Sequence, residues 1–226
     1  MLQDIVADAF PRPVGIIGGT GDQGRGLAYR FASAGIEVLI GSRTAERASE
    51  VADKFKLSNL RGAENKNVAT ECAIAIIAVP WAGHESTLKE LEPYLRGKIV
   101  IDCVNPLGFD DKGAFALKVA EGSACQQAQA LLPSSTVIGA FHSVSSVLLL
   151  DPDVTDLDID VLVLGDDRAA TDQVQALAET LPGARGIYGG RLRNAGQIEA
   201  FTANLISINR RYKAHSSLRI TLSSTS

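Results

Sequence analysis

The fold of this chain is decided by residues 14–47, VGIIGGTGDQGRGLAYRFASAGIEVLIGSRTAER. The apolar run Val14–Ile17 predicts a buried strand that stops at a glycine-rich turn. A helix is expected over 24–34 and a second strand over 37–40, after which Thr44 has the side chain of a helix N-cap. Strand, glycine-rich turn, helix and strand in this order predict a βαβ unit.

The same alternation continues to about residue 180. Further strands are expected at 73–79, 98–103, 137–140 and 161–164, and further helices at 84–95, 123–132 and 171–180. Residues 56–70 stay unassigned, and residues 107–122 predict a long loop because they contain three glycines. The pattern predicts an α/β fold, a doubly wound parallel-sheet Rossmann domain over 1–188, with 1–13 as a loose leader.

A small C-terminal helical segment, residues 189–226, is expected after a hinge at the glycine pair 189–190. Apolar residues at steps of three and four predict one stripe along a long helix: Ile198, Phe201, Leu205, Ile208 and Tyr212. Such a stripe is equally suited to packing on the sheet domain and to contacting a second subunit. The tail 216–226 predicts either a short strand or an ordered loop.

Composition excludes several classes of protein. The 226 residues are 46% hydrophobic and 21% charged, which is globular rather than disordered, and a net charge of -4 offers no general polycation for nucleic acid. The three cysteines form no C-x-x-C pair and the three histidines lie far apart, so we expect buried thiols in a reducing compartment and no metal site. No segment is long enough for a membrane span or resembles a signal peptide, so the expectation is a cytoplasmic protein.

The turn after the first strand carries G-x-G-x-x-G at Gly19, Gly21 and Gly24. Gly19 allows a tight turn, Gly21 allows a pyrophosphate to approach the backbone closely, and Gly24 allows the helix to pack close to the strand. The helix N-terminus would present free N–H groups to that anion. We therefore expect a dinucleotide on this loop, bound by Gly19, Thr20, Gly21, Asp22, Gln23 and Gly24; the alternative is a glycine-rich turn without a ligand.

The end of the second strand indicates which dinucleotide binds. NAD sites place an acidic residue there for the ribose 2′-hydroxyl, whereas this chain has Ser42 and Arg43, with Arg47 one helical turn later. A hydroxyl and guanidinium groups suit the 2′-phosphate of NADP, with Thr20 as an extra donor. The alternative is a solvated basic helix start, although basic residues are unfavourable at a helix N-terminus that holds no anion.

Ligands of Rossmann domains bind at the carboxyl ends of the strands. Residues expected at that crevice are Val79, Pro80, Trp81, Asn105, His142, Ser143 and Val144. Trp81 offers a flat surface for a ring and His142 could orient one, while core packing, capping and a satisfied structural histidine are the alternatives for Trp81, Asn105 and His142. The chain has no Y-x-x-x-K arrangement, which argues against short-chain-type ketone reduction. Direct hydride exchange between two redox cofactors needs fewer acid–base residues and fits this composition.

Residues 15–48, together with AIIAVPW at 75–81, VIDCVNPL at 100–107 and AFHSV at 140–144, resemble the family of F420-dependent NADP oxidoreductases. The resemblance extends over roughly residues 14–215. It implies that Thr20, Ser42, Arg43 and Arg47 hold NADP, and that hydride passes between the nicotinamide C4 and the deazaflavin C5 of coenzyme F420. It also implies that the segments 80–81 and 142–144 lie near the two rings, and that the protein is a homodimer whose C-terminal part helps to form the deazaflavin pocket.

Two other functions remain open at this point. The same domain could serve an NADPH-dependent reductase of another small acceptor, such as an imine, a carbonyl or ferric iron, and a proton donor in the pocket would favour that reading. His142 and Tyr188 are the residues that hint at such a donor. A non-catalytic NADPH-sensing module would bind the dinucleotide tightly and transfer no hydride.

Overall fold

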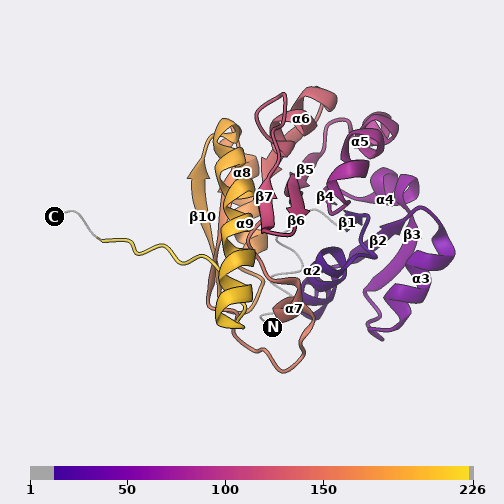
Figure 1. Cartoon of the computed structure of the whole chain (residues 1–226). Coiled ribbons are helices and arrows are strands. Elements are labelled where there is room, and N and C mark those ends of the chain that lie inside the picture. The colour runs from indigo at the N-terminus through magenta and orange to yellow at the C-terminus, as the bar shows by residue number, and fades with distance from the viewer. Residues whose placement is uncertain (1–12, 224–226) are drawn as a thin grey trace.

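The computed structural model describes residues 13–223, and an eight-stranded sheet forms its centre (Figure 1). The strand order is β10-β9-β8-β5-β4-β1-β2-β3. The strands are β1 Val14–Ile17, β2 Val38–Ser42, β3 Leu60–Glu64, β4 Ile74–Ile77, β5 Ile99–Asp102, β8 Thr136–Gly139, β9 Ile159–Leu164 and β10 Ala184–Gly190. Neighbours from β3 to β8 pair in parallel, as predicted, while β9 pairs antiparallel with β8 and parallel with β10. The predicted Rossmann-like α/β fold is confirmed.

Helices cover both faces of the sheet. One core joins the sheet to α2 (Asp22–Ser33), α3 (Ala45–Asp53), α7 (Ser146–Leu150) and α8 (Arg168–Ala178). The other core joins it to α4 (Asn65–Glu71), α5 (Trp81–Leu95), α6 (Ala124–Leu131) and the start of α9 (Ala195–Tyr212). Adjacent strand residues such as Ile76 and Ile77 enter opposite cores, which explains why the strands are continuous apolar runs in the sequence.

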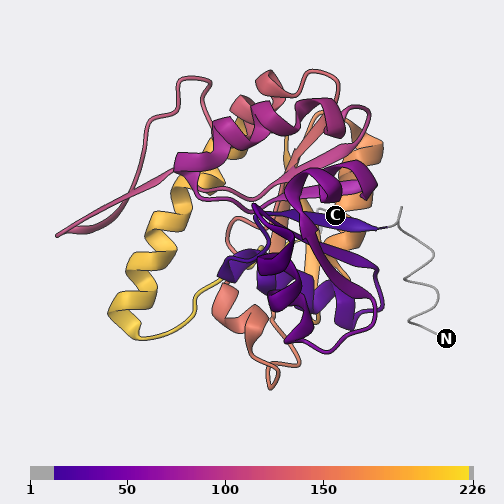
Figure 2. The same cartoon turned by 90° about the vertical axis from the view of Figure 1, so that its right-hand side faces the viewer.

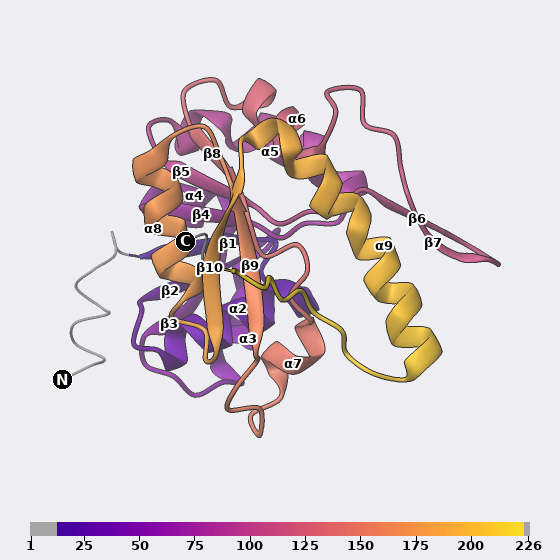
Figure 3. The ribbon, with the colours of Figure 1, turned by 90° about the vertical axis from the view of Figure 1, so that its left-hand side faces the viewer.

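The prediction of a long loop over 107–122 is wrong for its first half. Strands β6 (Leu107–Asp110) and β7 (Gly113–Ala116) form an antiparallel hairpin that projects from the body of the molecule (Figures 2 and 3). Its turn is fixed because the Asp110 carboxylate accepts the N–H groups of Lys112 and Gly113 at 2.8 and 3.1 Å, and Gly113 has φ 122°. The strands are short and their Phe109 and Phe115 side chains are exposed, so no core-facing alternation marked them in the sequence.

Other differences concern element boundaries. The unassigned stretch 56–70 contains both β3 and α4, and the expected hinge at 189–190 is the end of strand β10. Helix α5 begins at Trp81, three residues before the predicted start, because Pro80 occupies the N-cap position. The expected leader over 1–13 lies outside the described residues except for Pro13.

The C-terminal segment begins with a 3-10 turn, Leu192–Asn194, and continues as the long helix α9, Ala195–Tyr212. Figures 2 and 3 show α9 running obliquely away from the sheet, beside the β6–β7 hairpin. The predicted apolar stripe divides: Ile198 and Leu205 are buried in this fold, whereas Phe201, Ile208 and Tyr212 are 37%, 38% and 73% exposed.

The described part of the tail is an ordered loop rather than a strand. It returns to the sheet, where the buried Asp160 of β9 donates its N–H to the carbonyl of Leu218 at 2.8 Å. The Asp160 carboxylate accepts the N–H of Ile220 and a bidentate pair of bonds from Arg185, both at 2.6 Å. Residues 224–226 of the predicted tail lie outside the described residues.

A buried arginine fixes the segment that follows β8. Arg30 of α2 donates four hydrogen bonds to backbone carbonyls at the end of α7, those of Leu148, Leu149, Asp151 and Val154, at 2.6–2.9 Å. A cation suits the negative end of a helix, so this contact ties α7 to α2. The loop between β8 and α7 is thereby held against the carboxyl ends of the strands.

Candidate functional site

The glycine-rich loop joins β1 to α2 at the point where the strand order changes direction, between β1 and β4. A Cβ on Gly24 would lie 2.5 Å from the Cα of Gly19, so close packing of the helix requires this glycine. A Cβ on Gly21 would meet no protein atom within 3.8 Å, its nearest neighbour being the Gly18 carbonyl at 3.9 Å. The packing of the protein therefore does not require Gly21, and the open space beside it suits a ligand that approaches the backbone.

The N-terminus of α2 has no side-chain cap, because Gly21 occupies the N-cap position. Its first-turn N–H groups are therefore free to bind an anion. The loop itself is anchored from a distance, since the Asn65 side chain of α4 accepts the N–H of Gly18 at 3.1 Å. Asn65 was not foreseen, because nothing local in the sequence connects α4 with the first loop.

The end of β2 presents the predicted hydroxyl and guanidinium groups. Ser42 is its last residue, Arg43 and Arg47 are exposed, and Thr44 caps α3 by accepting the N–H of Arg47 at 3.4 Å. Arg47 lies 3.5 Å from Glu50, whereas Arg43 makes no ion pair with any of the residues that the structure describes. Arg43 is thus an uncompensated cation at a helix N-terminus, where an anionic group would be favourable.

Two adjoining hollows lie at the carboxyl ends of β4, β5 and β8. The first, of about 200 Å³, is lined by Gln23, Ala78, Val79, Pro80, Trp81, Cys103, Val104, Asn105 and His142. The second, of about 280 Å³, extends past residues 143–147 to α9 and the tail, at Thr202, Leu205, Ile206, Asn209, His215 and Ser216. Gln23, Asn105 and His142 line both, so the hollows meet at these side chains. All seven residues expected at the crevice are brought together here.

The loop that carries His142 has an unusual backbone. Phe141 is fully buried with φ 64°, in the left-handed region that non-glycine residues seldom adopt. Gln23 donates to the Phe141 carbonyl at 3.2 Å, and Asn105 donates to the His142 carbonyl at 3.0 Å. These bonds hold the strained turn in place and fix the side chains that separate the two hollows.

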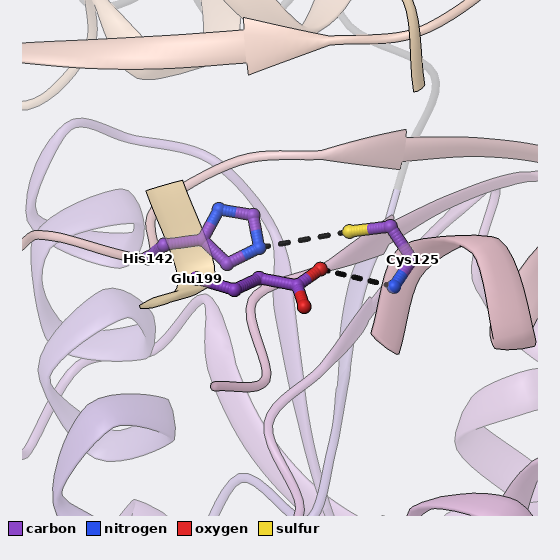
Figure 4. A group of neighbouring side chains, drawn as sticks. All are labelled: Cys125, His142 and Glu199. Atoms are coloured by element: carbon purple, nitrogen blue, oxygen red, sulfur yellow. Dashed lines mark hydrogen bonds between the residues drawn. The ribbon is translucent and has the colours of Figure 1, made fainter. Parts of the chain in front are cut away.

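His142 is a neutral imidazole at physiological pH. Burial lowers its pKa to about 4, although the charge of Asp102 partly opposes that shift. Its Nε2 lies 3.6 Å from the Sγ of Cys125 (Figure 4), and its Nδ1 is a buried atom without a hydrogen-bond partner among residues 13–223. The Oδ1 of Asn105 is likewise buried and unpaired, so both residues at the junction carry unused hydrogen-bonding capacity that a polar ring substituent could satisfy.

Cys125, His142 and Glu199 place three potential metal ligands within 4.8 Å of one another (Figure 4). Both oxygens of Glu199 are already used, however, because they accept the N–H groups of Ala124 and Cys125 at 2.9 and 3.1 Å. Glu199 thus reaches from α9 to cap the first turn of α6. Burial raises the pKa of Glu199, opposed by these two bonds. We interpret the cluster as a buried contact between α6, α9 and the His142 loop.

A second buried network lies behind Trp81. His84 and Asp102 are fully buried, with His84 Nε2 2.7 Å from Asp102 Oδ2 and His84 Nδ1 2.9 Å from Gln127 Oε1. Burial by itself lowers the pKa of His84, but the hydrogen bond and charge of Asp102 outweigh it and raise the pKa overall. These residues come from α5, β5 and α6, and no sequence pattern marks them as a group.

The features of the loop, the β2 end and the hollows together suit a phosphorylated dinucleotide with its ring at the crevice. The open space at Gly21, the uncapped α2 and the exposed Arg43 suit phosphate groups, and the two hollows suit a ring. The neutral His142 offers no strong acid to the hollows. The arrangement can therefore position rings at the two hollows.

Comparison with known proteins also indicates a protein that uses NADP. Residues 13–106 match a family model described as NADP oxidoreductase, coenzyme F420-dependent. The F420-dependent NADP reductase of Methanocaldococcus jannaschii is 38% identical over 219 residues, covering 92% of this chain and 97% of that protein. The F420-dependent NADP reductase of Methanothermobacter marburgensis is also 38% identical, over 87% of this chain and 92% of that protein.

Among solved structures, an Arthrobacter protein described as a candidate F420-dependent NADP reductase superposes with a TM-score of 0.80. It is 25% identical in sequence, and the alignment covers 92% of this chain and 99% of that one. Over residues 13–223, no helix has the length and the apolar character required to cross a membrane.

Proposed function

This chain belongs to the family of F420-dependent NADP reductases, and from that premise we propose that it transfers a hydride directly between NADP(H) and coenzyme F420. In the direction of F420 reduction, NADPH gives up a hydride and the oxidised deazaflavin takes up that hydride and one proton from solution. The products are NADP+ and reduced F420. Because the acceptor ring carries the hydride itself, the protein needs to align two rings rather than to form a covalent intermediate.

The NADP side of the proposal assigns each end of the dinucleotide to a separate part of the chain. The loop at 19–24 and the α2 N-terminus bind the pyrophosphate. Thr20, Ser42, Arg43 and Arg47 hold the 2′-phosphate, since a hydroxyl and two guanidinium groups stand where an NAD site has a carboxylate. The β2 end discriminates against NAD by offering no carboxylate to accept bonds from a free 2′-hydroxyl.

One observation carries the assignment of a second ring: the two hollows adjoin and share Gln23, Asn105 and His142. The nicotinamide ring would occupy one hollow and the deazaflavin the other, with their reacting carbons meeting at these shared residues. Val79, Pro80 and Trp81 form the wall of the first hollow, and Ser143 and Val144 belong to the second. His142 acts here as a neutral positioning side chain.

The direct test is deuterium transfer. The protein is mixed with oxidised F420 and NADPH that carries deuterium at the transferable C4 position, in ordinary water, and the loss of F420 absorbance is followed. We expect rapid bleaching and one deuterium in the reduced deazaflavin. Deuterium lost to water would contradict direct transfer, and tight NADPH binding without bleaching would contradict F420 as the acceptor.

We further propose that the enzyme works as a homodimer in the cytoplasm. The outward apolar side of α9 supports the dimer, because Phe201, Ile208 and Tyr212 are exposed on it. An apolar hollow of about 310 Å³ lies beside that helix, lined by Leu162, Leu164, Ile198, Phe201, Leu218 and Ile220, among others. The three cysteines are buried free thiols, which suits a reducing compartment. The division of the chain at 188/189 into two functional parts remains part of this proposal.

Sedimentation or light scattering tests the dimer. Ile208→Glu places a charge on the outward side of α9, and Gln173→Glu places the same charge on an exposed position of α8. We expect the wild type and the Gln173→Glu variant to be dimers and the Ile208→Glu variant to dissociate at micromolar concentration. A wild-type monomer, or dimers in all three samples, would contradict the assigned interface.

A further inference from the structure

A buried pair, His84 and Asp102, lies directly behind the only tryptophan of the chain, Trp81. The indole of Trp81 and the imidazole of His84 are one helical turn apart on α5, with ring centroids 5.3 Å apart and planes 33° apart. Trp81 lines the first hollow together with Asn105 and His142, whereas His84 is fully buried. His84 therefore supports the wall of the ring site without lining it.

Geometry defines the protonation state of His84. Its Nε2 faces a carboxylate oxygen of Asp102, which can only accept a hydrogen bond when ionised. Its Nδ1 faces the Oε1 of Gln127, and the amide orientation of Gln127 is fixed because its Nε2 donates to Glu121 at 3.3 Å. Both ring nitrogens of His84 thus face acceptors, which is the environment of an imidazolium with two N–H groups.

The surrounding charges agree with this assignment. Asp102 faces His84 from β5, Glu199 of α9 adds a more distant negative charge, and Glu85 follows His84 on α5. The remaining oxygen of Asp102 accepts the N–H of Val104 at 2.9 Å, which fixes the orientation of the carboxylate toward His84. His142, which lines the same hollow as Trp81, is neutral above its pKa of about 4.

We propose that the buried His84 imidazolium, fixed by Asp102 and Gln127, is a positioning residue that holds the Trp81 indole as the wall of the ring hollow, so that ring binding depends on its protonation. The inference rests on the proposed function for the identity of the rings. The link between His84 and Trp81 is a property of the free protein and can be measured without either ligand.

The first measurement is the fluorescence of the wild-type protein against pH. Since Trp81 is the only tryptophan, all of the indole emission comes from this site, and a neighbouring imidazolium quenches it. We expect the emission to rise in a single step as His84 loses its proton, at a pH above the ordinary histidine range near 6.5. A flat profile, or a step within or below that range, would overturn the proposal even if no variant could be purified.

The second measurement compares two ligands that share the 2′-phosphate. NADPH carries the nicotinamide ring and 2′,5′-ADP does not, so only NADPH reports on the ring hollow. Through the pH of the fluorescence step we expect the affinity for NADPH, measured by calorimetry, to fall a few-fold to about tenfold relative to that for 2′,5′-ADP, in keeping with the loss of a cation–aromatic contact. Parallel curves for the two ligands would overturn the proposal.

Asp102→Asn is the matched variant. The introduced amide can donate to a neutral His84 Nε2 while still accepting the N–H of Val104, so the charge is removed and the hydrogen bonds are retained. We expect this variant to lose both the alkaline fluorescence step and the pH-dependent gap between NADPH and 2′,5′-ADP. Persistence of either the fluorescence step or the pH-dependent gap in a folded variant would overturn the proposal. If the wild-type protein does not bind 2′,5′-ADP, that result would contradict the proposed function instead.

Discussion

Replacing Arg43 with alanine is expected to weaken NADPH binding about tenfold and to leave NADH binding unchanged. Arg43 follows the end of β2, where the ribose 2′-substituent of a Rossmann-bound dinucleotide lies. The 2′-phosphate of NADPH can accept bonds from its guanidinium group, and the 2′-hydroxyl of NADH has no negative charge to attract it. The loss should therefore appear for one of the two ligands.

The magnitude follows from exposure and from neighbouring charges. A hydrogen bond to a charged group contributes about 1.5–3 kcal/mol, and the exposed position of Arg43 favours the lower end, which corresponds to about tenfold in affinity. Arg47 already lies 3.5 Å from Glu50, so binding must compete with an existing ion pair. Arg47→Ala should consequently cost less than Arg43→Ala.

Calorimetric titration of NADPH and NADH into the two variants and the wild type measures these differences. Arg168→Ala is the control, because Arg168 is an exposed arginine on α8, away from β2. The free Arg43→Ala protein should also be slightly more stable, by a few tenths of a kcal/mol, because an unpaired cation is removed from the N-terminus of α3. Equal losses of NADPH and NADH affinity in Arg43→Ala would refute the assignment of the 2′-phosphate site.

Three further predictions concern stability and pH. Gly21→Ala should leave the free energy of unfolding within about 0.5 kcal/mol of the wild type but abolish tight NADPH binding. Gly24→Ala should lower the free energy of unfolding by about 1–3 kcal/mol, because its Cβ would meet Gly19. Urea unfolding measures the stability of each variant, and titration with NADPH measures its binding. Arg30→Met should lower the free energy of unfolding by at least about 3 kcal/mol in the same urea assay. The substitution leaves several backbone carbonyls near α7 without a hydrogen-bond donor, at a cost of about 1–3 kcal/mol each. A smaller loss would mean that water replaces the guanidinium group. The pKa of His84 is raised in the folded state, so its contribution to stability is complete below the unfolded pKa of about 6.5 and is lost as pH rises through the folded value. The difference in unfolding free energy between the wild type and His84→Gln should therefore shrink over that pH range. A difference that grows with pH would contradict the assignment.

The sequence predicts those features of the fold that depend on neighbouring residues. The Gly19–Gly24 turn, the alternation of strands and helices and the stripe on α9 are local patterns, and each predicted strand has a counterpart in the sheet. The antiparallel placement of β9 was not predicted, because strand direction depends on partners elsewhere in the chain. The β6–β7 hairpin was not predicted, because its exposed Phe109 and Phe115 leave no core-facing alternation in the sequence.

The site divides in the same way. Residues at the ends of predicted strands could be placed at the crevice because parallel strands bring their carboxyl ends to one edge of the sheet. Asn65, Glu199 and the His84–Asp102 pair could not, since each acts on a segment from a different element: Asn65 on Gly18, Glu199 on the start of α6, and Asp102 on α5. Such polar pairs leave no periodicity in the sequence, and only the folded arrangement shows which atoms they serve.

The positions of these unforeseen groups bear on how the crevice keeps its shape. Gln23, Asn105 and His142 stand between the two hollows. Gln23 and Asn105 donate to backbone carbonyls of the turn that carries His142 and contains a left-handed Phe141. A strained turn persists only where surrounding contacts favour it. Here the contacts come from Gln23 of α2, from Asn105 three residues after β5, and from Thr202 of α9, which donates to the His142 carbonyl at 3.4 Å. Since α9 also carries the exposed apolar side assigned to the dimer, a displacement of α9 would reach His142 directly through Thr202, and through Glu199 by way of Cys125. The proposed dimer and the proposed ring site are therefore mechanically connected, and the dissociating variant Ile208→Glu should lose hydride-transfer rate while retaining its affinity for 2′,5′-ADP.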